Sequence, residues 1–319
     1  MSDQTRRVWR AGKPGLVLVG LFAGVAGVAI PVLAYMIYRS EGTPWIPALL
    51  IGLTVLALAY AWRFGLHPRL VATDHGVQVV NPLHRSSLEW DDITVIAPGE
   101  NGLVVASEEQ RAEAWCVQKS NRATRRAKVT RADLIAHQLL DILELFDPPL
   151  EDDQTGLRIR RARFDESRLL TQLERGASEA TLAHLFPPDQ YPYPTAEIQR
   201  RWRRLLRDGR THVHILQLND EPVGYVAFGA GCVQHLGVLP EHTRRGYGSA
   251  LLEFASLELF STADPEASLW VLNGNAAARA FYRAHRWTET DDRRRSEYPP
   301  HPESVRMVRK NPAAPRRSR

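Results

Sequence analysis

The residues whose types and spacing suit chemistry are concentrated in residues 236–252, which read LGVLPEHTRRGYGSALL. An apolar, strand-like run ends at Pro240, two arginines and a Gly-Tyr-Gly turn follow, and an apolar helical pattern begins at Ala250. The first turn of a helix has backbone N–H groups without internal partners and carries the positive end of the helix dipole, so it can bind a phosphate. Glycines also serve plain turns that bind nothing. The flanking sequence must therefore decide between an anion site and a simple corner.

A second stretch, residues 269–287, reads LWVLNGNAAARAFYRAHRW. A strand-like run is followed by Asn275, which we predict to cap a helix. Ala278 and Tyr282 follow at offsets of three and seven, and these offsets place them on the same helix face as the cap. This arrangement places an amide and a phenol on one face of the predicted helix.

The elements around these stretches predict a mixed α+β layer. We expect a strand at 157–164, a helix from 165 to about 183, the loop FPPDQYPYP, and a strongly basic helix at 196–209. Strands at 211–218 and 222–229 would form a hairpin across an Asn-Asp-Glu turn. A strand at 233–238 leads into the glycine turn, and a closing pair of strands is expected near Trp287 and 305–308.

This order and these two motifs resemble the GNAT N-acetyltransferase superfamily, across residues 157–310. The first motif is close to that family's acyl-CoA pyrophosphate loop, and the second is close to its Asn-x-x-Ala-x-x-Phe-Tyr helix. The resemblance implies a GNAT fold with acetyl-CoA as cosubstrate and no metal. It also implies Tyr282 as the general acid for the leaving thiolate, with a core aromatic as the alternative. The implied acetyl-CoA contacts are Leu236, Gly237, Val238, Thr243, Arg244, Arg245, Gly246, Tyr247, Gly248, Ser249 and Asn275.

Other site residues are less sharply indicated. Thr243 stands where the family usually has Gln or Arg, and Arg286 stands where it usually has Gly, so the turn before Trp287 is expected to be built differently. His235 is a candidate general base, as is His214, although either histidine could simply pack in the core. Tyr191 and Tyr193 are candidates for lining the acceptor pocket.

The start of the chain holds two apolar segments, residues 15–38 and 45–62. The first would span about 36 Å as a helix, at roughly 1.5 Å per residue. The second is near the lower limit for a bilayer core of about 30 Å. We predict two transmembrane helices; a cleaved signal peptide for the first and a buried core helix for either are the alternatives.

The flanking charges orient this hairpin. Positive residues cluster before the first segment and after the second, whereas the loop between them pairs Arg39 with Glu41. Positive charge stays inside, so both termini and both soluble domains are expected in the cytoplasm of a multi-pass protein of the plasma membrane, with the lipid bilayer as a partner. The inside cations are Arg6, Arg7, Arg10, Lys13, Arg63 and Arg69.

Residues 67–146 change to short β-rich runs followed by a helix that a capping box at Thr130 and Asp133 would start. We predict a small, partly open β-barrel with a helix over one end. The runs RLVATDHGVQVVNPLHR, LEWDDI and EAWCVQKSN resemble actinobacterial membrane-anchored pleckstrin-homology-like domains. That resemblance implies a fold near the membrane and no catalytic activity.

Composition bounds the remaining possibilities. Lys and Arg outnumber Asp and Glu by 41 to 36, and Cys116 and Cys232 lie far apart, as expected for reduced thiols without a metal. The segment 1–14 is a basic N-terminus, 147–156 reads as a linker, and 311–319 as a basic tail. The basic run 119–131 suits either a membrane surface or a solvated loop. The arginines of 200–204 come without a DNA-reading motif, which disfavours nucleic acid.

Two functions follow from the sequence. The first is a membrane-anchored N-acetyltransferase that moves an acetyl group from acetyl-CoA to an amine, on a small molecule or a protein, by direct attack in a ternary complex. The alternative is a non-catalytic acyl-CoA sensor or membrane scaffold that uses a degenerate GNAT domain, which the two motif departures and the lack of an evident base would suit.

Overall fold

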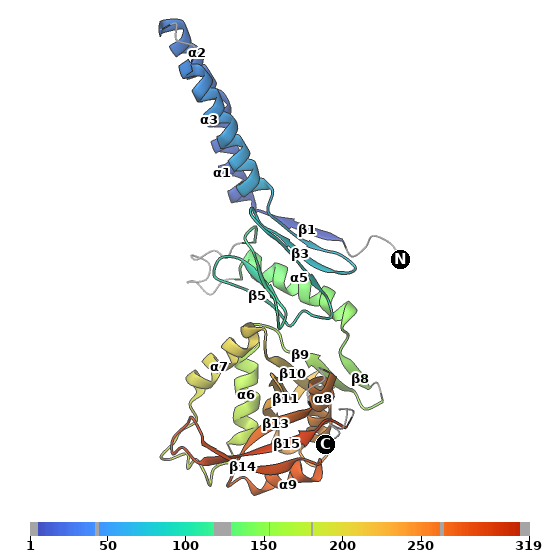
Figure 1. The fold of residues 1–319 in the computed structure, drawn as a ribbon. Coiled ribbons are helices and arrows are strands. Elements are labelled where there is room, and N and C mark those ends of the chain that lie inside the picture. Colours follow the sequence, from blue (N-terminus) through green and yellow to red (C-terminus); the bar gives the residue numbers. More distant parts are fainter. Residues whose placement is uncertain are drawn as a thin grey trace, which may run out of the picture. The chain divides into compact units, whose positions relative to one another are not determined.

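Two units make up the chain in the computed structural model, Met1–Asp147 and Pro148–Arg319 (Figure 1). The structure describes residues 6–41, 45–117, 129–152, 154–179, 181–261 and 265–312. Most of the basic run 119–131 and of the basic tail lies outside these residues. Cys116 is buried, Cys232 is half-buried, and both are free thiols.

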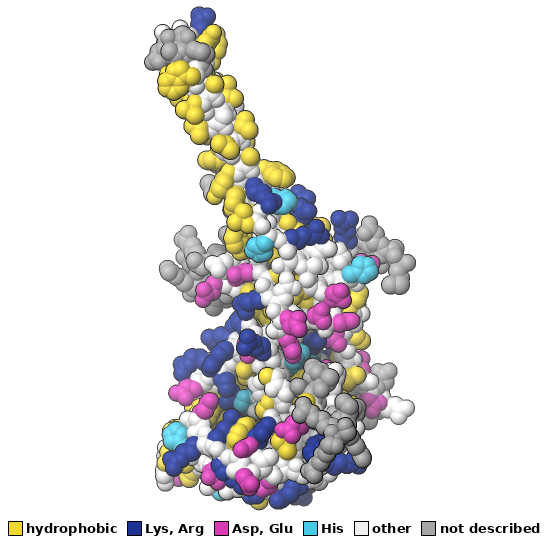
Figure 2. Space-filling view, in the orientation of Figure 1, with side chains coloured by type: hydrophobic (Ala, Val, Ile, Leu, Met, Phe, Trp, Pro, Cys, Tyr) yellow, Lys and Arg dark blue, Asp and Glu magenta, His cyan; other side chains and the backbone are white. Residues whose placement is uncertain are grey.

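The two apolar segments form a helical hairpin. The first helix consists of α1 (Lys13–Gly24), a π-helical turn η1 (Val25–Ala29) and α2 (Ile30–Glu41), and the second of α3 (Trp45–Ala61) and η2 (Trp62–Leu66). Val19–Ser40 and Trp45–Leu66 are long and apolar enough to cross a membrane. Hydrophobic side chains cover the outside of this hairpin (Figure 2). Such a large exposed apolar surface is typical of a segment that contacts lipid or protein.

Strand pairing joins the two ends of the hairpin. Strand β1 (Arg7–Arg10) precedes α1, and β2 (Arg69–Ala72) follows η2. They pair antiparallel, with Arg10 opposite Arg69, so the chain enters and leaves the hairpin at adjacent points. The sequence did not predict β1.

The other described residues of the first unit form two antiparallel sheets and a helix. The β-rich runs expected in this region give strands β2 to β7, although β7 ends at Ala114, and the strands form one sheet in the order β1-β2-β3-β4 and another in the order β5-β6-β7. The predicted partly open barrel is therefore wrong in its closure: β4 and β5 are consecutive but belong to different sheets. The strands are β3 (Gly76–Val80), β4 (Arg85–Glu89), β5 (Val95–Pro98), β6 (Leu103–Ala106) and β7 (Arg111–Ala114).

Helix α5 (Arg131–Phe146) confirms the predicted capping box. The Thr130 hydroxyl accepts from the Asp133 backbone N–H, and the Asp133 carboxylate accepts from the Thr130 N–H at 2.6 Å. These bonds satisfy two N–H groups that a helix start leaves open. The helix buries one face, including Ile135, Leu139 and Leu143.

The second unit is built on one mixed sheet of eight strands, in the order β14-β15-β13-β12-β11-β10-β9-β8. Strand β8 lies inside the segment expected to be a linker, and it pairs with β9. The elements are β8 (Leu150–Asp152), β9 (Leu157–Arg161), α6 (Ser167–Ser178), α7 (Thr195–Asp208), β10 (His212–Leu218), β11 (Glu221–Gly229), β12 (Cys232–Val238), η3 (Pro240–His242), α8 (Tyr247–Ser261), β13 (Glu266–Leu272), α9 (Ala276–Ala284), β14 (Thr288–Arg295) and β15 (Glu303–Lys310).

Helices cover both faces of this sheet. The α8 side buries Leu251 and Leu252 together with Trp287, and α9 packs against the edge of that cluster. The opposite core joins α6 and α7 to the sheet through Trp202 and Tyr225. A strand residue near the centre of the sheet therefore faces either α8 and α9 or α6 and α7.

The turn after α9 has the conformation usual for glycine, although Arg286 was expected to make this turn different. Arg286 adopts a left-handed conformation, with φ of 66°. The Trp287 N–H donates to the Tyr282 carbonyl at 3.1 Å, and the Arg286 N–H donates to the Arg283 carbonyl at 3.0 Å. These are the two bonds of a Schellman motif, so Arg286 occupies the left-handed position that glycine usually fills.

Arg286→Gly is therefore expected to raise the thermal unfolding midpoint of this unit. The left-handed conformation costs a non-glycine residue about 1–2 kcal/mol, which exceeds the extra unfolded-state entropy of glycine, roughly 0.5–1 kcal/mol. Differential scanning calorimetry of the full chain in detergent measures the change. Arg286→Ala removes the same side chain but keeps the strain, so a rise in that variant as well would contradict the explanation.

Candidate active site

The centre of the site is a gap between β12 and β13. The two strands run parallel and pair at Cys232 with Ser268 and at Val233 with Leu269. Beyond those pairs both strands continue without a shared ladder, while the other edge of β12 stays paired with β11 up to Val238 opposite Gly224. The β12 backbone at 236–238 therefore presents an open edge, to which an extended amide chain can bind as a strand would.

The loop after β12 ends in a cluster of N–H donors. The Thr243 hydroxyl donates to the Pro240 carbonyl at 2.8 Å and closes the 3-10 turn. Arg244 and Gly246 then take positive φ values of 60° and 87°. The first N–H of α8 with a helical acceptor is that of Ala250, bonded to the Gly246 carbonyl at 2.9 Å. In the described part of the chain, the preceding N–H groups at 247–249 have no acceptor.

The space in front of Gly246 is open. A Cβ placed on Gly246 would meet no atom within 4 Å, so the backbone faces open space. Arg244 and Arg245 are exposed beside it, and neither forms an ion pair with a described residue. Unpaired N–H groups at a helix start with two adjacent cations are the groups that bind a phosphate ester.

His285, which the sequence analysis did not single out, attaches α9 to this loop. Its Nδ1 lies 2.8 Å from the Phe281 carbonyl oxygen, and its Nε2 lies 2.9 Å from the Ser249 hydroxyl. Because a carbonyl can only accept, Nδ1 of the neutral ring carries the proton and Nε2 accepts from Ser249. The helix that carries Tyr282 is thereby fixed to the first turn of α8.

Tyr282 is half-buried on α9, between Phe281 and Trp287. Desolvation raises the pKa of its hydroxyl to about 12, so the phenol keeps its proton across the neutral range. Asn275 accepts a hydrogen bond from the Ala278 N–H at 3.1 Å, as a helix cap does. These contacts give Asn275 a structural role in addition to the predicted cofactor contact.

His235 lies across the sheet from Tyr282, on the face covered by α7. Its ring is 5.2 Å from that of Trp202. Burial, with smaller contributions from the charges of Arg201 and Arg294, lowers the pKa of His235 to about 3. The ring is therefore neutral at physiological pH and takes up a proton weakly.

The other predicted residues have different surroundings. His214 is buried, packs against Phe228 and Phe254, and has a pKa held well below its usual value by desolvation, as expected for a core histidine. The Tyr193 hydroxyl is buried without a described hydrogen-bond partner, near Arg175. Tyr191 is half-buried in the same loop and donates its backbone N–H to the Pro187 carbonyl at 2.8 Å.

Sequence reasoning missed a polar cluster on the α6–α7 side. Glu174 forms an ion pair with Arg201 and accepts from Trp202 Nε1 at 2.7 Å. Arg201 Nη1 also donates to the Tyr298 hydroxyl at 3.3 Å. Tyr225 is buried beside this cluster, and a tyrosine inside the apolar run 222–229 of β11 was a signal of it in the sequence.

Tyr225 connects this cluster to β12. A Cβ on Gly237 would lie 2.7 Å from the Tyr225 ring and 2.9 Å from its hydroxyl oxygen. The charges of Glu174 and Tyr282 both raise the pKa of Tyr225, after burial as the main cause. The Tyr225 hydroxyl thus lies at the open strand, within electrostatic reach of both Tyr282 and Glu174.

The lowered pKa of His235 makes stability depend on pH. The unfolded chain binds the proton below about pH 6.5, whereas the folded chain resists it down to about pH 3. Stability is therefore lost as the pH falls through this window. We expect His235→Gln to reduce the drop in unfolding midpoint between pH 7 and pH 5, measured by intrinsic fluorescence. The exposed His75→Gln should leave that drop unchanged, and an equal drop in the His235 variant would contradict the assignment.

Comparison with known proteins gives one family match. The model of the acetyltransferase (GNAT) family matches residues 178–286. No curated protein matches the chain. Solved structures with a similar fold include PaiA N-acetyltransferase from Thermoplasma acidophilum in complex with coenzyme A, with 16% identity, 48% of this chain and 98% of that chain covered, and a TM-score of 0.39.

Two further structures match the same share of the chain. An acetyltransferase from Thermus thermophilus has 20% identity, covers 49% of this chain and 97% of its own, and has a TM-score of 0.36. A mutant of spermidine N-acetyltransferase SpeG from Vibrio cholerae has 16% identity, covers 49% of this chain and 94% of its own, and has a TM-score of 0.37. The family match spans the donor loop, the open strand and the tyrosine helix together. The C-terminal half of this chain is therefore an acetyltransferase domain of the GNAT family, whose fold implies acetyl-CoA as cosubstrate.

Proposed function

We propose that the chain is a membrane-anchored N-acetyltransferase that transfers the acetyl group of acetyl-CoA to an amine by direct attack in a ternary complex. The observation that carries this proposal is the alignment of three features on one side of the sheet. These are the donor cluster at 247–249, the open edge of β12, and Tyr282, which His285 fixes to the same loop.

Two groups of residues would bind different parts of acetyl-CoA. The N–H groups of the first turn of α8, with Arg244 and Arg245, would hold the pyrophosphate. The open edge at 236–238 would pair with the amides of the pantetheine arm. Bound acetyl-CoA supplies an acetyl group activated as a thioester. Its orientation by two separate binding regions restricts the reacting carbon to the gap between β12 and β13.

Tyr282 acts on the leaving sulfur. Its raised pKa of about 12 keeps the phenol protonated. The hydroxyl therefore donates a hydrogen bond to the sulfur as negative charge develops there, and passes its proton as the C–S bond breaks. The proton is recovered from the nitrogen of the attacking amine, so the phenol is regenerated and the charges balance.

We propose that His235 contacts the attacking amine, from the face of the sheet opposite Tyr282. With a pKa of about 3, its neutral imidazole can accept a hydrogen bond from the amine, directly or through water, but stores a proton poorly. We therefore assign it an orienting role in proton transfer. Tyr191 and Tyr193 are proposed to line the acceptor approach from their loop.

The membrane location is part of the proposal. Two apolar helices with exposed side chains and ends joined by β1 and β2 suit a hairpin that crosses the bilayer twice. Cations flank the joined ends, and by the positive-inside rule these ends and the acetyltransferase domain would lie on the cytoplasmic side. The two sheets and α5 of the first unit would form a pleckstrin-homology-like module near that surface.

Calorimetry and thiol release test the proposal on the full chain in detergent micelles. Saturable acetyl-CoA binding together with amine-dependent release of coenzyme A would support it. Absence of binding would remove the whole proposal. Binding without turnover for any amine, peptide or small metabolite would instead favour the acyl-CoA sensor, which the weak basicity of His235 would suit.

A further inference from the structure

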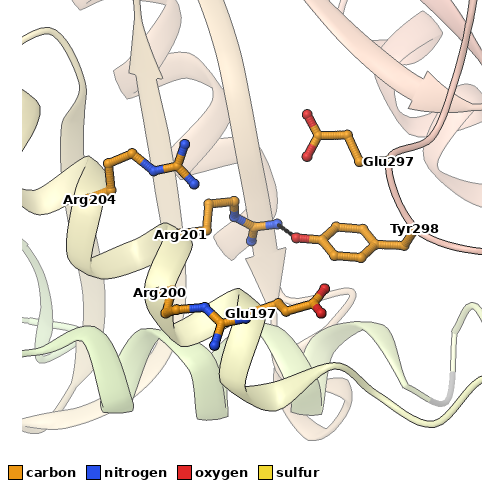
Figure 3. A pocket seen from close by; sticks show the side chains of 6 residues that line it. All are labelled: Glu197, Arg200, Arg201, Arg204, Glu297 and Tyr298. Atoms are coloured by element: carbon orange, nitrogen blue, oxygen red, sulfur yellow. Dashed lines mark hydrogen bonds between the residues drawn. The ribbon is translucent and has the colours of Figure 1, made fainter.

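A charged pocket lies on the α7 side of the acetyltransferase domain. It has a volume of about 310 Å³ and lies between α7 and the loop from β14 to β15. Arg200, Arg201 and Arg204 extend from α7 towards Glu297 and Tyr298 of that loop, and Glu197 lies at the first turn of the helix (Figure 3). The pocket brings charged groups of both signs together on a domain whose proposed function requires an amine acceptor.

Arg201 forms the inner wall of the pocket. Its side chain is only 14% exposed, and its charge is matched by Glu174. It also donates to the Tyr298 hydroxyl, the contact drawn in Figure 3. Arg201 Nε is buried without a described acceptor. Because its charge is neutralised in place, Arg201 shapes the pocket and offers one remaining N–H.

The inner wall is close to the reacting centre. Glu174, the partner of Arg201, accepts from Trp202 Nε1 at 2.7 Å, and the Trp202 ring lies 5.4 Å from the Tyr225 ring. Tyr225 in turn contacts Gly237 on the open strand. The pocket wall is therefore linked to the open strand through packed side chains, on the same face of the sheet.

Two guanidinium groups and two carboxylates of the pocket remain available to bind a ligand. Arg200, Arg204, Glu197 and Glu297 are exposed, and within the described residues none of them forms an ion pair. Guanidinium groups bind carboxylates and phosphates with paired, charge-assisted hydrogen bonds. The two carboxylates offset the positive field, so a ligand of mixed charge fits better than a polyamine or a polyanion.

We propose that the acceptor is a small zwitterionic amine, one that carries a carboxylate or phosphate group besides its reacting nitrogen, and that Arg200 and Arg204 bind this anionic group. The proposal rests on the acetyltransferase function proposed above. It adds a substrate class and assigns Arg200 and Arg204 to acceptor specificity.

Pairs of amines that differ in the presence of an anionic group test the proposed substrate class. Coenzyme A release is measured with the full chain for L-amino acids and for phosphoethanolamine, each beside the amine that lacks the anionic group, such as L-lysine with cadaverine and phosphoethanolamine with ethanolamine. In at least one pair, we expect kcat/KM for the amine with the anionic group to exceed that for its partner by tenfold or more. Whether this is the carboxylate pair or the phosphate pair shows which group is preferred. Best turnover with spermidine, cadaverine or a peptide amine overturns the proposal.

Substitutions on one helix test the site. Arg200→Gln and Arg204→Gln should each raise KM for the anionic acceptor about tenfold, the typical loss for one charge-assisted pair, and leave KM for acetyl-CoA unchanged. Arg203→Gln is the matched control, because Arg203 is exposed on the same helix outside the pocket. An equal rise in the control overturns the site.

The two proposals fail in different ways. A chain that does not bind acetyl-CoA removes the acetyltransferase function. A chain that binds acetyl-CoA and acetylates only amines without an anionic group keeps that function and overturns the substrate class.

Discussion

Tyr282→Phe is expected to lower kcat about 100-fold or more, while the Kd for acetyl-CoA changes less than twofold. A positioned general acid typically contributes about 10²–10⁴ in rate. The substitution removes one oxygen from a ring that remains packed between Phe281 and Trp287, so the fold and the cofactor loop should persist. Initial-rate kinetics and calorimetry on the same preparation separate the two quantities.

The pH profile adds an independent test of the same residue. Because the pKa of Tyr282 is raised to about 12, the wild-type rate should show no loss from tyrosine ionisation below about pH 10. Tyr38→Phe, in the apolar hairpin, is the control for removing a phenol elsewhere and should leave kcat unchanged. An unchanged kcat in the Tyr282 variant would remove its role as the acid.

Gly237→Ala is expected to reduce both stability and kcat/KM. Its Cβ would lie 2.7 Å from the buried Tyr225 ring, which has to move. Overpacking of a filled core costs about 1–3 kcal/mol, and the displaced ring would disturb the open strand, so kcat/KM should fall by roughly tenfold or more. Thermal unfolding and initial rates measure the two effects.

Two further variants show whether the contact with Tyr225 is responsible. In the double variant Gly237→Ala with Tyr225→Leu, the smaller side chain makes room for the methyl group, so the two stability losses should be less than additive. Gly248→Ala is the matched glycine, since its Cβ would meet nothing closer than Phe281 at 3.6 Å. Its unfolding midpoint without ligand should not fall. Additive losses in the double variant would contradict the steric explanation.

The sequence predicted those features that depend on neighbouring residues. Short β-rich runs identified most strands of both units, although not β1 or β8, and local hydrogen-bonding side chains identified the capping box at Thr130 and the cap at Asn275. The glycine turn before α8 was likewise visible, because a strand that ends in a Gly-rich turn and a helix has a short-range signature.

The features that sequence reasoning missed depend on distant contacts. The predicted partly open barrel was wrong because β4 and β5 belong to different sheets, and β1 was missed because it pairs with β2 about sixty residues later, which no periodicity reveals. The cluster of Glu174, Arg201 and Tyr298 joins three separate elements. Arg286 was expected to change its turn, yet packing of Trp287 and two backbone bonds hold it in the left-handed conformation.

The pairing of β1 with β2 also sets an order for folding. Strand β1 is synthesised before either apolar helix, but its partner β2 follows both of them. Closing so long a loop is entropically costly, and the antiparallel helices lower that cost by bringing Arg10 and Arg69 together. We therefore expect the first sheet to be completed after the hairpin has formed. A helix that fails to pack in the hairpin would leave β1 without a partner and expose the edge of β2 to other chains.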